Sequence, residues 1–147
     1  MRYLAVLAAL ACAGASVEAR AYCIHNELKE TTVTLLQDHH PDKIREERRM
    51  RATLKPGDKV CCEVKQLDCN PEGKPGSPVS LMVTIDSDPP RACGVASGQD
   101  KERFVKVAGN GVLRIQDNKR SAANPYIIRI TGADGRDVTG PSGLACQ

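Results

Sequence analysis

Apolar and polar residues alternate with a period of two along much of this chain, and this pattern constrains the fold most strongly. In Val79–Ile85, valine, leucine and isoleucine alternate with serine, methionine and threonine. Successive side chains of a strand point to opposite faces, so this alternation predicts strands with one buried face. Similar runs are Thr31–Leu35, Met50–Leu54, Val60–Val64, Leu113–Ile115 and Tyr126–Thr131, with weaker candidates at Tyr22–Asn26 and Arg103–Val107.

Turn-forming residues separate these runs. Lys55-Pro56-Gly57-Asp58 predicts a turn, because proline presets φ and glycine accepts positive φ. Prolines and glycines fill the stretch 70–78, which predicts a loop, and Asp134-Gly135 is a pair favoured in tight hairpins. We therefore predict an all-β fold, a small antiparallel β-sandwich or barrel of about 7–8 strands stapled by disulfides.

The first residues have the pattern of a secretory signal peptide. Arg2 supplies a positive charge, and an apolar run of about a dozen residues follows, shorter than the roughly twenty that span a bilayer. Small residues then stand at cleavage spacing, which predicts a signal peptide over residues 1–21 with cleavage after Ala19 or Ala21. We expect a single domain over residues 22–147, secreted or delivered to the vacuole or cell wall, with no transmembrane segment.

Removal of the signal peptide changes the cysteine count. The chain has 7 cysteines, and Cys12 lies within the predicted signal peptide. An even number of cysteines in an oxidising compartment predicts up to three disulfides, whose connectivity the sequence leaves open. The remaining cysteines are Cys23, Cys61, Cys62, Cys69, Cys93 and Cys146.

The adjacent pair Cys61-Cys62 lies within a predicted strand. Cys62 shares a face with Val60 and Val64, so we expect it to point inward and staple the core. Cys61 should point outward, where it could bond a loop carrying Cys69 or Cys93, or another copy of the protein. These alternatives separate a solitary protein from a homo-oligomer formed through Cys61.

Composition argues against several classes of function. The net charge of +3 is small, and the mature chain has few aromatic residues on which nucleic-acid bases could stack. Lectins often stack sugar rings on exposed aromatic residues, and no tryptophan is present. The sequence also lacks a G-x-S-x-G elbow, an H-E-x-x-H pair and a P-loop. We predict no enzyme activity, no cofactor and no nucleic-acid partner.

Two polar clusters are weak candidates for binding sites. Histidine and aspartate are suitable ligands for zinc or copper, and the metal candidates are His25, Asp38, His39, His40 and Asp42. Arginine suits carboxylate, phosphate or sulfate partners, and the candidates for anion or partner contact are Arg45, Arg48, Arg49 and Arg51.

The expected function is that of a secreted, non-catalytic binding module acting on an extracellular protein or glycan. One alternative is a structural protein that assembles with itself, its oligomers locked by interchain disulfides. A second alternative is a small secreted protein that binds a metal or a carbohydrate.

Overall fold

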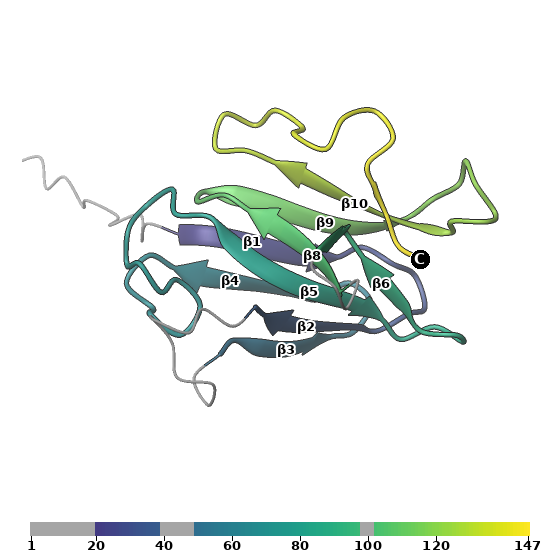
Figure 1. Ribbon diagram of the computed structural model, residues 1–147, viewed down its shortest axis with the longest axis horizontal. Helices are drawn as coiled ribbons and strands as arrows, with labels where there is room; N and C mark the ends of the chain where they lie inside the picture. The colour runs from purple at the N-terminus through teal and green to yellow at the C-terminus, as the bar shows by residue number, and fades with distance from the viewer. Residues whose placement is uncertain (1–19, 39–48, 98–101) are drawn as a thin grey trace, which may run out of the picture.

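The computed structural model describes residues 20–38, 49–97 and 102–147. Two β-sheets pack against each other around an aliphatic core (Figure 1), which confirms the predicted sandwich. The described residues form eleven strands, more than the predicted seven or eight. The difference comes from β6 (Arg91–Cys93), β7 (Val95–Ser97) and β11 (Leu144–Ala145), which are too short to show alternation.

The first sheet contains the two ends of the described chain. Its spatial order is β11, β10 (Tyr126–Thr131), β9 (Gly111–Asp117), β1 (Arg20–Asn26) and β4 (Lys59–Glu63). Strands β1 and β9 are parallel, whereas the other pairs of this sheet are antiparallel. The sandwich is thus not wholly antiparallel, because the amino-terminal strand is inserted between β4 and β9.

The second sheet is antiparallel. Its spatial order is β3 (Arg51–Leu54), β2 (Val33–Gln37), β5 (Val79–Ile85), β8 (Glu102–Val107) and β7, and β6 pairs with β5. Residues 39–48, between β2 and β3, lie outside the described part of the chain. None of the described segments forms a helix able to span a membrane.

The core is built from the apolar members of the alternating runs. Leu81, Val83 and Ile85 of β5 are buried, as are Leu113 and Ile115 of β9. These side chains are aliphatic, and burying each contributes roughly 1.5–3 kcal/mol relative to exposure. The alternation therefore predicted which face of each long strand points inward.

Tyr22 is the only tyrosine among the fully buried side chains of the described residues. Its hydroxyl donates a hydrogen bond to the Cys69 carbonyl oxygen at 3.1 Å, so the buried oxygen is not left unpaired. Burial raises the pKa of Tyr22 well above its usual value, because the phenolate would lose its hydration. Tyr22 thus fixes the loop that follows β4 onto the core.

All six predicted cysteines are paired within the chain, as Cys23–Cys61, Cys62–Cys69 and Cys93–Cys146. Cys62 is buried, as its position in the alternation predicted. The expectation that Cys61 bonds a loop carrying Cys69 or Cys93 is wrong. Cys61 is directly opposite Cys23 in the register of β4 and β1, so the bond joins neighbouring strands instead.

The Cys93–Cys146 disulfide attaches the carboxyl-terminal residues to both sheets. The main chains of Ala92 and Gln147 exchange two hydrogen bonds of 2.9 Å beside this disulfide. The Cys146 N–H donates to the Tyr126 carbonyl oxygen of β10 in the first sheet. The carboxyl-terminal residues therefore link β10 of one sheet to β6 of the other.

Strand β1 begins before the predicted domain boundary at residue 22. Arg20 and Ala21 belong to β1, and Ala21 is buried, with its carbonyl oxygen accepting the Asn110 N–H. Of the two predicted cleavage positions, only the one after Ala19 leaves this strand whole.

We expect a disulfide that closes a longer stretch of chain to stabilise the fold more than one that closes a shorter stretch. The separations are 53 residues for Cys93–Cys146 and 7 for Cys62–Cys69, and all four cysteines are buried. Chain entropy then predicts losses of about 4 and about 2 kcal/mol for the double alanine variants of the two pairs. Urea unfolding measures both, and a larger loss for the Cys62–Cys69 pair would contradict this ranking.

Candidate functional site

The structure places the described metal candidates on different sheets. His25 lies on the outward face of β1 in the first sheet, and Asp38 directly follows β2 in the second. The structure therefore does not bring these two side chains together. His39, His40 and Asp42 lie outside the described residues. Within the described ranges, no group of three or more histidine, cysteine or acidic residues could hold a metal ion.

Cationic neighbours surround His25. Its register partners are Lys59 on β4 and Arg114 on β9. The pKa of His25 is lowered, first by burial and then by the charge of Arg114, with Lys59 acting in the same direction and Glu27 opposing. Positive charges on two sides make this position unfavourable for a metal cation.

The described arginines of the second cluster lie beside β3. Arg51 is exposed on this edge strand, opposite Leu36 of β2. Arg49 is half-buried just before the strand. Arg45 and Arg48 lie outside the described residues, so the structure does not show whether the four gather into one site.

A groove of about 660 Å³ lies beside β8 and is here called the side groove. Phe104 and Lys106 of β8 line it together with Ser80 of β5, and Ile130 and Leu144 line it from the first sheet. Asp38, Val95, Ala96, Val138 and Thr139 complete the lining. Val95 and Val138 are 64% and 65% exposed, so the groove presents apolar surface to solvent.

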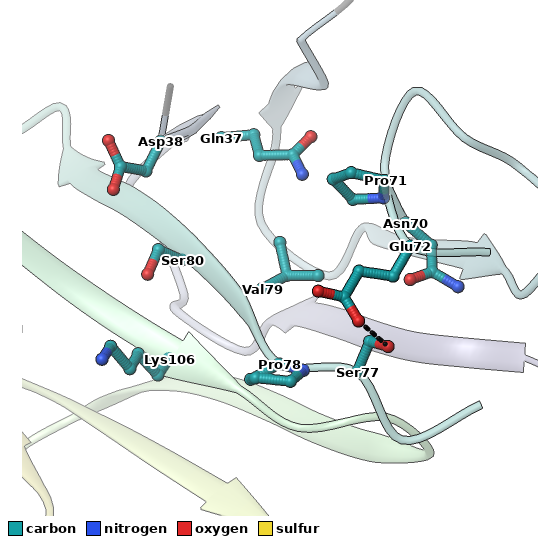
Figure 2. A pocket seen from close by; sticks show the side chains of 10 residues that line it. All are labelled: Gln37, Asp38, Asn70, Pro71, Glu72, Ser77, Pro78, Val79, Ser80 and Lys106. Carbon is teal, nitrogen blue, oxygen red and sulfur yellow. Dashed lines mark hydrogen bonds between the residues drawn. The ribbon is translucent and has the colours of Figure 1, made fainter. Parts of the chain in front are cut away.

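A second cavity, of about 230 Å³, adjoins the side groove (Figure 2) and is here called the loop pocket. The two cavities share Asp38, Ser80 and Lys106. Figure 2 shows Ser80 between the Asp38 carboxylate and the Lys106 ammonium group. The remaining lining of the loop pocket is Gln37, Asn70, Pro71, Glu72, Ser77, Pro78 and Val79.

The Cys62–Cys69 disulfide and two buried donors position one wall of the loop pocket. The Cys69 carbonyl oxygen accepts hydrogen bonds from Tyr22 and from the Gln37 amide. The next residue, Asn70, is fully buried, and its Nδ2 donates to the carbonyl oxygens of Val64 at 2.7 Å and Lys74 at 3.2 Å. Asn70 therefore joins the two ends of this loop.

The Oδ1 atom of Asn70 is buried and has no hydrogen-bond partner. Exchanging the amide oxygen and nitrogen would not remove this deficit, because Oδ1 would then face two carbonyl oxygens. An unpaired buried acceptor costs roughly 1–3 kcal/mol, so the site favours a ligand or water that donates. In Figure 2 this oxygen lies on the side of Glu72 and Ser77.

The loop pocket is rich in hydrogen-bond acceptors. The Glu72 carboxylate accepts a hydrogen bond from the Ser77 hydroxyl at 3.1 Å, and the Asp38 carboxylate stands at the junction with the side groove. Acceptors of this kind suit an ammonium or guanidinium group, which carries several donors. The side groove is more apolar, so the two cavities together suit a group with a cationic and an apolar part.

Sequence reasoning singled out only Asp38 among the residues of these cavities, and it assigned Asp38 to a metal site. The other lining residues come from both sheets and from two loops. Their proximity depends on strand order, which alternation does not specify. The one local signal was the loop 70–78, predicted from its prolines and glycines and found to line the loop pocket.

Comparison of the chain with protein-family models, curated protein sequences and solved structures found no significant match. The function is therefore argued from the site alone.

Proposed function

We propose that this protein is a secreted, non-catalytic binding module that holds a segment of an extracellular partner protein. The segment occupies the side groove with apolar side chains and the loop pocket with a lysine or arginine side chain. The observation that carries the proposal is the continuity of the two cavities through Asp38, Ser80 and Lys106.

The size and lining of the side groove support a binding role. Its volume of about 660 Å³ lies within the range of known ligand sites, roughly 300–1,000 Å³. Val95 and Val138 expose apolar surface at its edge, which a partner would remove from water. The Cys93–Cys146 disulfide orders the main chain beside Leu144. This supports a wall of the side groove that is formed before the partner binds.

Charge complementarity identifies the polar end of the partner segment. Asp38 and Glu72 provide two carboxylates, and the buried Oδ1 of Asn70 provides an acceptor that lacks a donor. A lysine or arginine side chain in the loop pocket would bring donors to this acceptor-rich lining, in which the Glu72 carboxylate already accepts the Ser77 hydroxyl. Lys106 stands at the junction, where it would repel a second cation and so favour one orientation of the segment.

The absence of catalysis is part of the proposal. The hydroxyl groups that line the two cavities belong to Ser77, Ser80 and Thr139, and the same linings contain no histidine or cysteine. Activation of a serine hydroxyl most often uses an adjacent histidine as the base.

Three intramolecular disulfides fit an oxidising environment. Together with the predicted signal peptide, they support secretion as the route of the protein. We do not propose self-assembly through Cys61, because its sulfur bonds Cys23 of the same chain.

Selection of binding peptides from a random library tests the partner class. We expect enriched peptides to combine apolar residues with a lysine or arginine. The double variant Val95→Ser/Val138→Ser should weaken their binding about thirtyfold, since roughly 1 kcal/mol of apolar burial is lost at each position. Asp38→Asn should weaken binding of the same peptides by removing one carboxylate.

The matched control is Leu67→Ser, which changes a side chain of 60% exposure outside both cavities and should leave binding unchanged. Isothermal calorimetry of each variant gives the comparison. Selected peptides that lack a cation, or that bind the double variant as tightly as the unchanged protein, would overturn the proposal.

Secretion is tested by the mature amino terminus. We expect protein recovered from the culture medium of an expressing cell to begin at Arg20, because removal through Ala21 would delete the first two residues of β1, including the buried Ala21. Amino-terminal sequencing reads this directly. Protein kept inside the cell and still carrying Met1 would contradict secretion.

A further inference from the structure

A row of basic side chains crosses the outer face of the first sheet. His25 of β1 is the register partner of Lys59 on β4 and of Arg114 on β9, and Arg114 is the partner of Arg129 on β10. Register partners share a face of a sheet, and neighbouring strands lie about 4.8 Å apart. Lys59, His25, Arg114 and Arg129, here called the cationic row, therefore form a line across four strands.

Ion pairs hold the two arginines in place without cancelling the charge of the row. Arg114 pairs with Glu27 at 3.2 Å, and Arg129 pairs with Asp137 at 2.8 Å. Both pairs are partly exposed, so a ligand can reach them. Two acids thus face three permanent cations and one histidine.

The positive charge continues past Arg129 into a separate cavity of about 410 Å³. Lys119 and Arg120 line this cavity together with Arg129, whereas Asp117 is the one acidic residue of its lining. The cationic row therefore ends in a hollow that is itself positively charged, and the whole face attracts anions.

Burial is the first cause of the lowered pKa of His25, and the charges of Arg114 and Lys59 lower it further, in agreement with this potential. An anion bound across the row would reverse this effect and favour the protonated imidazole. His25 would then add a donor to the ligand.

The chemistry of the face selects among anionic partners. The described aromatic residues lie elsewhere, since Tyr22 and Tyr126 belong to the core and Phe104 to the side groove. Single-stranded nucleic acids bind through stacking on aromatic rings as well as through charge, and this face has no such ring among the described residues. A regular line of separate cations instead matches an unbranched chain with one anionic group on each repeating unit.

We propose that the outer face of the first sheet binds a linear acidic polysaccharide, whose carboxylate or sulfate groups lie along the cationic row. This site lies on the outer face of the first sheet, whereas the side groove and the loop pocket, which take a protein segment, lie beside β8 and the loop 70–78.

Binding to polygalacturonate and to heparin, measured by calorimetry at low ionic strength, tests the proposal. Polygalacturonate carries carboxylates alone and heparin carries sulfates as well, so the two probes distinguish the anionic group. The double variant Lys59→Gln/Arg114→Gln should weaken binding of the preferred polymer about tenfold, since an exposed ion contact contributes roughly 0.5–1 kcal/mol. Arg114→Lys, which keeps the charge, should retain most of the affinity.

The charge-matched control is Arg51→Gln/Lys74→Gln, which removes two exposed cations away from the row. This control also tests Arg51, one of the arginines that the sequence suggested for anion contact. We expect the affinity of the control variant to stay within about twofold of the unchanged protein. Heparin binding should strengthen as the pH falls from about 7 to about 5, and His25→Gln should abolish this gain. The charged groups that surround His25 are Lys59, Arg114 and Glu27.

Three results would overturn the proposal. Neutral dextran could bind as tightly as both acidic polymers, or the control could lose as much affinity as the row variant. Single-stranded oligonucleotides could bind more tightly than either polysaccharide, which would assign the face to nucleic acid.

Discussion

Successive side chains of a strand point to opposite faces, and in β4 this constraint sends two adjacent cysteines in opposite directions. Cys61 points outward and bonds Cys23 of β1, whereas Cys62 points inward and bonds Cys69. The first bond ties the edge strand to its neighbour on the face that carries the cationic row. The second fixes the loop whose next residue, Asn70, forms a wall of the loop pocket. Both candidate binding surfaces therefore depend on the direction of these two side chains.

The long strands could be predicted because each has enough residues to show its alternation. Val79–Ile85 was predicted to its end residues, and the buried members of the run are those that alternation assigned to the core. Strands β6, β7 and β11 were missed, since two or three residues carry no period. The parallel pairing of β1 with β9 could not be predicted either, because it depends on which distant strand completes the sheet.

The candidate sites were less accessible from the sequence than the fold. The set of bonded cysteines followed from the count after the predicted signal peptide, but the pairing of Cys61 with Cys23 follows from strand order. Each of four strands contributes one basic residue to the cationic row, so the sequence contains no local cluster of charge that indicates it. The arginines that do cluster, from Arg45 to Arg51, lie beside the edge strand β3 or outside the described residues. Register, not sequence proximity, places side chains of different strands on one face, so local density of charge does not indicate such a row.

The central claim is that the six described cysteines form three disulfides within one chain. Disulfide mapping by mass spectrometry, with stepwise reduction to separate the adjacent Cys61 and Cys62, tests this most directly. The account predicts the pairs Cys23–Cys61, Cys62–Cys69 and Cys93–Cys146 in a monomer. A Cys23–Cys62 pair, or any bond between two chains through Cys61, would contradict it.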